Sequence, residues 1–321
     1  KKLLAVRKSL PFTLTAAQEK ALAEILSDMQ SGRPMSRLLQ GDVGSGKTIV
    51  AALAALVAVQ NGCQAAILAP TEILAQQHFA KLAEIFSKTK LKLDILTATT
   101  SSEQKRAELL NKDIIVGTHA LLEKKVKFRD LGLVVIDEQH RFGVQQRAGL
   151  VKKGLAPHLL VMTATPIPRS LALTLYGDLD RSLIDELPPC RTPVKTHFVP
   201  EEKRAGAYKF IRSKVQEGRQ IFIVYPLVEE SEALDLKAAK DEADKLQKEA
   251  FPELRIGLMH GKMKGAEKEK IMQAFIGRQI DILVSTTVIE VGIDVPNAAV
   301  MLVEHAERFG LSQLHQLRGR I

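Results

Sequence analysis

Short apolar runs alternate with longer amphipathic segments along most of the chain. In the first half, the runs with the character of buried strands are residues 37–40, 65–69, 93–98, 114–117, 131–136 and 159–163. Amphipathic stretches such as 72–87 and 102–110 lie between them. Continuous apolar strands that alternate with helices are typical of a parallel sheet covered on both faces. The pattern therefore predicts an α/β domain.

A second alternating series begins near residue 194. Its predicted strands are 195–199, 220–225, 255–259, 280–285 and 299–303, and its predicted helices are 201–217, 231–249 and 265–276. Leu187-Pro188-Pro189 separates the two series, and a proline-marked break is typical of a linker. We therefore predict two α/β domains, residues 1–189 and 190–321, with a nucleotide site in the cleft between them.

Composition narrows the class of partner. The net charge is +9, from 46 Lys and Arg against 37 Asp and Glu, which favours a polyanionic partner. Because Trp is absent and only three Tyr are present, nucleic acid would be held through its phosphates rather than by base stacking. The longest apolar run, 49–59, is too short to span a membrane, and no signal peptide is visible. The widely spaced Cys63 and Cys190 favour reduced thiols in the cytoplasm.

The first candidate site is the stretch Gly41-Asp42-Val43-Gly44-Ser45-Gly46-Lys47-Thr48, between a short strand and an Ala/Val/Leu-rich helix. Its spacing, G-x-x-x-x-G-K-T, is that of the phosphate-binding loop of nucleoside triphosphatases. The glycines let the backbone approach a ligand closely, and the N–H groups at the start of the next helix form an anion site. Lys47 would neutralise the β- and γ-phosphates, and the Thr48 hydroxyl would hold Mg²⁺. The loop predicts binding of ATP with Mg²⁺.

Two later strand ends carry further candidates. Asp137 and Glu138 follow the apolar run 133–136, and an acidic residue in this position holds Mg²⁺ in phosphate-loop enzymes. Asp137 is therefore predicted to be a metal ligand, and Glu138 is placed to orient and deprotonate the attacking water. Thr163 and Thr165 end the next strand, where they would hydrogen-bond the segment from Asp137 to His140 and couple nucleotide state to the rest of the domain.

These motifs, in this order, resemble the core of the superfamily 2 helicases. A second domain with Ser285-Thr286-Thr287 and a terminal Gln316-Leu317-Arg318-Gly319-Arg320 extends the resemblance over essentially the whole chain. Within the superfamily the chain is most similar to the RecG family of bacterial branch-migrating DNA helicases, on long strings such as 117–120, 184–188 and 226–232. The translocase domain of the transcription-repair coupling factors is the alternative, because it shares strings 141–144 and 309–311. An RNA helicase would have D-E-A-D at 137–140.

The resemblance implies a fold and a set of roles. The fold would be two tandem RecA-like domains, each a mostly parallel sheet flanked by helices, with the nucleotide in the cleft between them. Phe12 and Gln18 would contact the adenine, and Gly292 and Asp294 would approach the nucleotide from the second domain. Gln316 would order the attacking water and Arg320 would reach the γ-phosphate. The DNA backbone would be contacted by Pro70, Thr71, Thr118, His119, Thr286 and Thr287.

The chain also departs from the family pattern. The family's second arginine would fall just beyond Ile321, and we expect its amino-terminal wedge domain and the motif loop that follows the core to be absent from this chain. Ala98 and Cys190 stand where relatives usually have Gly. The first departure would weaken one DNA contact, and the second lies in the predicted linker.

The activity implied is that of an ATP-dependent DNA helicase or translocase, which in its parent protein drives branch migration and fork regression. Its partners would be forks and Holliday junctions, with no membrane. We expect a monomer in the bacterial cytoplasm, associated with the nucleoid. A truncated core that binds nucleotide and DNA without motor activity is the alternative from another functional class.

Overall fold

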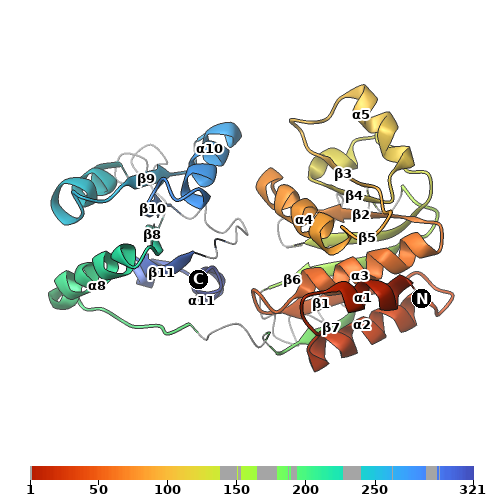
Figure 1. Ribbon diagram of the computed structural model, residues 1–321, viewed down its shortest axis with the longest axis horizontal. Helices are drawn as coiled ribbons and strands as arrows, with labels where there is room; N and C mark the ends of the chain where they lie inside the picture. The colour runs from red at the N-terminus through yellow and green to blue at the C-terminus, as the bar shows by residue number, and fades with distance from the viewer. Residues whose placement is uncertain are drawn as a thin grey trace. The chain divides into compact units, whose positions relative to one another are not determined.

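The computed structural model describes residues 2–137, 150, 153–164, 179–186, 188, 194–226, 240–261, 263–286, 295 and 297–321. The chain divides into two compact units, Lys1–Arg191 and Thr192–Ile321. Each unit has a parallel sheet flanked by helices, so the predicted fold class is confirmed (Figure 1). None of the helices in the described ranges is long and apolar enough to cross a membrane.

The first unit contains, within its described residues, a seven-stranded sheet in the order β3-β4-β2-β5-β6-β1-β7. Every pair in it is parallel. The strands are β1 (Ser36–Gly41), β2 (Gln64–Leu68), β3 (Leu93–Leu96), β4 (Ile114–Gly117), β5 (Leu131–Asp137), β6 (His158–Thr163) and β7 (Asp180–Ile184). Because all strands run the same way, their carboxyl ends meet at one edge of the sheet, where the loops of the candidate site lie.

The helices of this unit are α1 (Lys2–Ser9), α2 (Ala16–Met29), α3 (Lys47–Gln60), α4 (Glu72–Ile85) and α5 (Glu103–Glu108), with the short 3₁₀ turns η1 (Leu109–Asn111) and η2 (His119–Leu122). Helix α3 is buried at nearly every position from Ile49 to Ala58, and it packs on β1, β2 and β5 and against α2. A helix that is apolar all round belongs inside a domain. This burial fixes the loop before α3 against the sheet.

The second unit contains, in its described part, a four-stranded parallel sheet in the order β11-β8-β10-β9. Its strands are β8 (Gln220–Val224), β9 (Ile256–Met259), β10 (Ile282–Ser285) and β11 (Ala298–Val303). Its helices are α8 (Arg204–Gln216), α10 (Gly265–Ile276) and α11 (Leu311–Arg318), with the short elements η4 (Glu201–Lys203), η5 (Leu246–Ala250) and η7 (Ala306–Arg308). Successive residues of a strand face opposite sides. Accordingly Ile221 and Ile223 pack with α8, whereas the Phe222 ring lies 4.9 Å from Phe275 on α10.

A buried glutamine begins a central strand in each unit. Gln64 donates from Nε2 to the carbonyls of Leu109 and Lys112, at 2.9 and 2.6 Å. Gln220 does the same for Phe275 and Ile280, at 2.5 and 2.7 Å. Burying polar groups is tolerated only when they are hydrogen-bonded, and here one amide donates to two backbone carbonyls at the amino edge of each sheet.

Two local expectations from the sequence differ from the structure. Residues 195–199 were expected to form a strand, which is wrong: the segment has no regular structure, and the Phe198 side chain is 91% exposed. Apolar residues here have no neighbouring strand to pack against. Conversely, the sequence pattern did not predict β7. As an edge strand it buries only Ser182 and Ile184, so its sequence contains no continuous apolar run. The thiol of Cys63 is free, and Cys190 lies outside the described residues.

Candidate functional site

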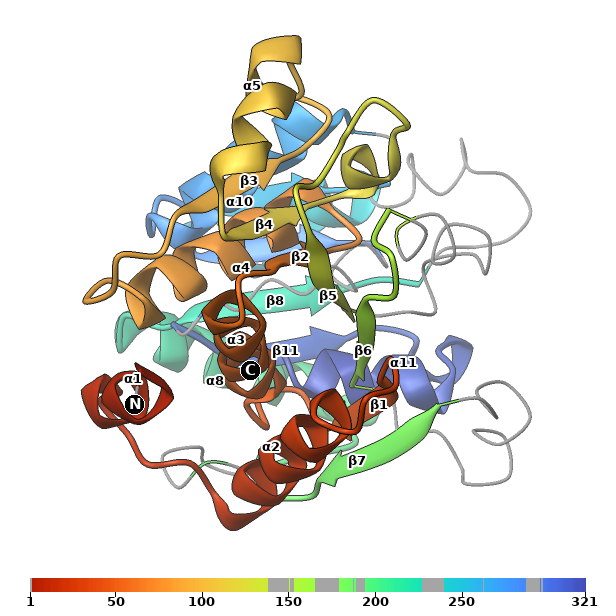
Figure 2. The same ribbon diagram turned by 90° about the vertical axis from the view of Figure 1, so that its right-hand side faces the viewer.

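The candidate residues of the first unit gather at the carboxyl edge of its sheet. The loop Gly41–Thr48 follows β1, Asp137 ends β5 and Thr163 ends β6. Asp137 is level with Met162 on β6, which is level with Leu39 on β1. Since neighbouring strands lie about 4.8 Å apart, the Cα atoms of Asp137 and Leu39 are about 10 Å apart, with one strand between them. Figure 2 shows β5, β6, β1 and β7 side by side. This is the edge at which open parallel sheets bind ligands.

The loop after β1 has the backbone that a phosphate cradle requires. Gly44 and Gly46 have φ of +79° and +86°, in the left-handed region that favours glycine. Gly46 precedes α3, so the first N–H groups of that buried helix point into the loop. The Lys47 ammonium folds into the same space and donates to the carbonyls of Gly41 and Asp42, at 2.7 and 2.9 Å. Backbone N–H groups and a lysine at one helix start are the elements of an anion site.

Gln18 lies in the first turn of α2 and contacts this loop instead of the open surface. It is 3% exposed, and its Nε2 donates to the carbonyl of Ser45 at 2.7 Å. Its Oε1 accepts from the N–H of Thr15 at 3.0 Å, which completes a capping box at the start of α2. Phe12, by contrast, is 48% exposed. The structure therefore places Gln18 against the loop Gly41–Thr48, and its amide supports the loop by the hydrogen bond to Ser45.

Asp137 is held by a residue that the sequence motifs did not include. Its Oδ2 lies 2.8 Å from Nε2 of His78, which lies on α4. Both side chains are nearly buried, at 13% and 11% exposed. The available signal was the helical spacing of the buried face of α4, where His78 follows Leu74 and Ala75 and precedes Leu82. A histidine on a buried apolar helix face needs a polar partner, but the sequence pattern of that face does not say which residue the partner is.

The donor set at this edge suits a magnesium ion. In the described residues, no three His, Cys, Asp or Glu side chains cluster as a self-sufficient metal site. Mg²⁺ prefers oxygen ligands and is usually held by one or two carboxylates together with substrate phosphates and water. The carboxylate of Asp137 and the hydroxyl of Thr48, at the second position of α3, supply that chemistry. The site fits a metal that arrives with a nucleotide.

The candidate DNA contacts of the first unit also follow strands at this edge. Pro70 and Thr71 follow β2, and Thr71 caps α4 by accepting the N–H of Leu74 at 3.4 Å. Thr118 follows β4 and is 1% exposed, and its Oγ1 has no hydrogen-bond partner among the described residues. His119 is exposed beside it. Although the Thr71 hydroxyl already caps α4, other N–H groups at the start of that helix can still contact a phosphate.

In the second unit, the described candidates are Thr286, Gln316 and Arg320. Thr286 follows β10 and is 2% exposed. Gln316 is buried on α11, and Arg320 follows that helix, where its N–H donates to the carbonyl of Leu317 at 3.0 Å. Six other predicted positions lie outside the described residues: Glu138, His140, Thr165, Thr287, Gly292 and Asp294. Thr163, at the end of β6, is buried.

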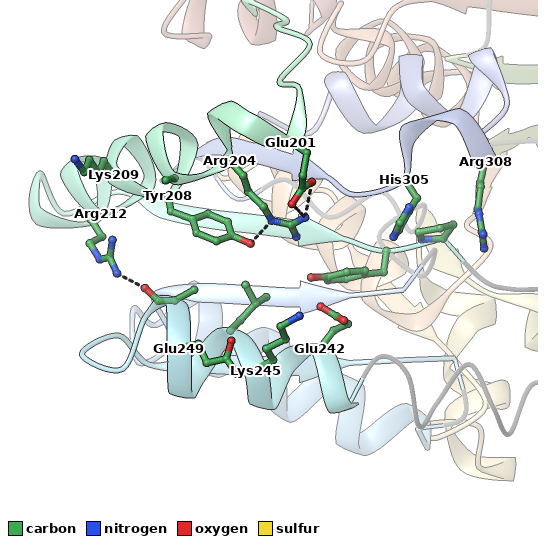
Figure 3. A pocket seen from close by; sticks show the side chains of 15 residues that line it. Glu201, Arg204, Tyr208, Lys209, Arg212, Glu242, Lys245, Glu249, His305 and Arg308 are labelled. Carbon is green, nitrogen blue, oxygen red and sulfur yellow. Dashed lines mark hydrogen bonds and ion pairs between the residues drawn. The ribbon is translucent and has the colours of Figure 1, made fainter.

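The second unit also has a pocket of about 680 Å³, lined by α8, the helical segment 240–250 and the residues after β8 and β11 (Figure 3). Arg204 lies at its centre, donating to Tyr208 Oη at 2.8 Å and to carboxylates of Glu304 and Glu201 at 2.7 and 3.1 Å. Burial raises the pKa of Glu304, and the nearby Arg204 opposes that rise. The cation thus ties the start of α8 to the end of β11.

Comparison with known proteins gives consistent matches. The family model described as DEAD/DEAH box helicase matches residues 15–174, and the helicase conserved C-terminal domain matches residues 202–321. The chain is 56% identical over 317 residues to the ATP-dependent DNA helicase RecG of Synechocystis, covering 97% of this chain and 38% of the relative. It is 55% identical to the same-named protein of Thermotoga maritima, covering 98% and 41%.

A solved structure, RecG bound to a three-way DNA junction, is similar over 100% of this chain and 43% of that one, with 49% identity and a TM-score of 0.85. The chain therefore spans less than half the length of each of these relatives.

Proposed function

Because the chain belongs to the RecG family of ATP-dependent DNA helicases, we propose that it is the ATP-driven core of a motor that moves on branched DNA. The observation that supports this most directly is the convergence of the phosphate loop, Asp137 and two candidate DNA-contact loops on one edge of a parallel sheet. A motor needs nucleotide and DNA sites that share rigid elements. The first unit carries candidate residues for both sites at the ends of its strands.

The nucleotide would be bound mainly by the loop Gly41–Thr48. The N–H groups around Gly44, Ser45 and Gly46 would bind the phosphates, and Lys47 would exchange its carbonyl partners for phosphate oxygens. Mg²⁺, held by Thr48 and Asp137, would supply charge neutralisation on the phosphates. Phe12 would cover one side of the adenine. Gln18 would contact the adenine from its place beside the loop, through the amide N–H that Ser45 does not use.

Hydrolysis would break the bond between the β- and γ-phosphates. We assign Glu138 to take the proton of the attacking water, and Gln316 to orient that water. Arg320 would stabilise the charge on the γ-phosphate, while Gly292 and Asp294 would approach the nucleotide from the second unit. Thr163, Thr165 and His140 would transmit nucleotide state within the first unit.

DNA would be held through its backbone. Thr71 and Thr118, with Pro70 and His119, stand at the starts of α4 and η2, and helix starts offer N–H groups to phosphates. Thr286 and Thr287 would do the same in the second unit. The net charge of +9 suits this mode, because counterion release favours binding to phosphates. We further propose a monomer that works in the bacterial cytoplasm, at the nucleoid.

Lys47→Ala tests the proposal. Phosphate release is measured with and without a three-way DNA junction, and binding of a fluorescent ATP analogue is measured beside it. We expect turnover to fall by about 10²-fold or more, as when one charge-stabilising donor is removed from an active site. Lys90→Ala is the matched control, because Lys90 is exposed just before β3, at the opposite edge of the sheet. Near-normal turnover in Lys47→Ala would overturn the assignment.

The same measurement separates the motor from a module that only binds. A binding module would hold the ATP analogue and the junction without phosphate release that rises on adding DNA. A motor core would show release that depends on both Lys47 and DNA.

A further inference from the structure

We infer that His78 is a positioning residue that links the DNA-contacting start of α4 to the metal-binding carboxylate of Asp137. The inference rests on the proposed function, since it concerns how that function is coupled. Its basis is the 2.8 Å contact between His78 Nε2 and Asp137 Oδ2, which joins two separate segments of the first unit. His78 is carried by the helix that follows β2, and Asp137 ends the neighbouring strand β5.

The contact has a defined direction. An ionised carboxylate can only accept hydrogen bonds, so the proton lies on Nε2 of His78 and is donated to Oδ2. A side chain with one carboxylate oxygen fixed has lost most of its rotational freedom. The orientation of the whole carboxylate, Oδ1 included, is then restricted at the edge of the sheet where β5 ends. Hydrogen bonds of this kind to a ligating carboxylate orient it and tune its affinity for the metal.

The surroundings make the arrangement rigid. Residues Leu74 and Leu82, one turn before and after His78, are buried, at 5% and 0% exposed. The side chain of His78 is therefore held on a packed face of α4, which contacts β3 and β4. Little space remains for either partner to turn away. A shift of α4 along its axis would have to move the donor relative to the carboxylate.

The other end of the same helix is where we place a DNA contact. Thr71 caps α4, and about two turns, roughly 10 Å of helix, separate it from His78. Glu72, in the first turn, accepts from the N–H and the hydroxyl of Thr99, at 3.2 and 3.1 Å. Phosphates that engage the start of α4 would therefore act on a rigid rod whose other turns hold Asp137. The coupling is reciprocal, because a metal–nucleotide complex that fixes Asp137 must favour the same position of α4.

His78→Leu removes the donor and keeps an apolar side chain in the stripe. His78→Gln restores a donor, because its Nε2 lies at a reach similar to that of the imidazole Nε2. Gln77→Leu, on the same helix, is the control for a changed side chain that does not touch Asp137. His78→Met serves as a second donor-free variant if the leucine variant does not fold, as judged by circular dichroism.

Two readouts do not depend on turnover. The first is the Mg²⁺ or Mn²⁺ concentration needed for tight binding of a non-hydrolysable ATP analogue. We expect it to rise about 10- to 100-fold in His78→Leu and to return toward wild type in His78→Gln. The second is the change in affinity for a three-way junction when metal and analogue are added. We expect that change to shrink in His78→Leu, whereas junction affinity without nucleotide stays as in wild type.

An unchanged metal requirement in the donor-free variants would overturn the inference, as would equal defects in His78→Leu and His78→Gln, which indicate packing alone. These results are distinguishable from failure of the proposed function. If that function were wrong, wild type itself would show no Lys47-dependent binding of the ATP analogue.

Discussion

Replacing Gly46 by alanine tests the geometry of the phosphate loop most directly. Gly46 has φ of +86°, and a Cβ added there would lie 2.3 Å from Nε2 of Gln18. That nitrogen donates the 2.7 Å hydrogen bond to the carbonyl of Ser45. The substitution therefore imposes two separate penalties: a left-handed backbone on a residue with a side chain, and displacement of a buried amide.

Gly62 supplies the first penalty alone. It lies at the other end of the same helix, just after the C-cap of α3, with φ of +89° and no heavy atom within 4 Å of an added Cβ. A left-handed conformation costs a residue with a Cβ about 1–2 kcal/mol. Alanine also restricts the unfolded chain, which offsets about 0.4–1 kcal/mol. We expect Gly62→Ala to lower the free energy of unfolding by about 1 kcal/mol.

Gly46→Ala adds the cost of the displaced amide. Leaving a buried polar group without its partner costs about 1–3 kcal/mol, so the total should be about 2–4 kcal/mol. Urea unfolding followed by far-ultraviolet circular dichroism gives both values, and the difference between the variants isolates the contact with Gln18. In a Gln18→Ala background the extra cost should disappear, because the atom that clashes is gone.

Gly46→Ala should also weaken binding of an ATP analogue, whereas Gly62→Ala should not, because Gly46 belongs to the loop before α3 and Gly62 follows the other end of that helix. Equal destabilisation by Gly46→Ala and Gly62→Ala, or an extra cost that survives in the Gln18→Ala background, would refute the reasoning.

Two further predictions concern the second unit. Arg255 donates to both carboxylate oxygens of Asp281, at 2.9 and 2.6 Å, and this pairing lowers the pKa of Asp281. A lowered folded-state pKa stabilises the fold above the unfolded pKa of about 3.9 and ceases to do so as the pH falls through the folded value. The urea midpoint of Asp281→Asn should therefore lie below wild type at pH 7, with a gap that closes below about pH 4; a gap independent of pH would contradict this. Gln220→Leu should cost about 1–3 kcal/mol in urea unfolding, because the carbonyls of Phe275 and Ile280 lose their hydrogen bonds from the buried Gln220 amide, whereas the exposed Gln216→Leu should change little.

Local patterns were sufficient for the parts of the site that one segment specifies. The loop Gly41–Thr48 needs glycines at fixed spacing and a lysine at a helix start, and the structure gives Gly44 and Gly46 the left-handed φ that this implies. Asp137 is likewise predictable, because an acidic residue that directly follows an apolar strand run is recognisable in the local sequence. The alternating pattern was sufficient for the fold class, since continuous apolar strands require cover on both faces.

Patterns were insufficient where burial depends on a distant partner. Residues 195–199 and β7 each contain two apolar residues, yet no described strand pairs with 195–199, whereas β7 pairs with β1 at the sheet edge. Apolar character predicts that a segment is covered, and it cannot say whether a neighbouring strand is available.

The sequence by itself was enough to predict which residue types would meet a triphosphate, because that pattern lies in a short contiguous loop and a strand end. Tertiary structure alone decided that the Gln18 amide braces this loop and that His78 holds the carboxylate of Asp137. Those contacts join positions 27 and 59 residues apart in the chain. Only the strand order and the packing of α2 and α4 set such distances, and no local pattern encodes them.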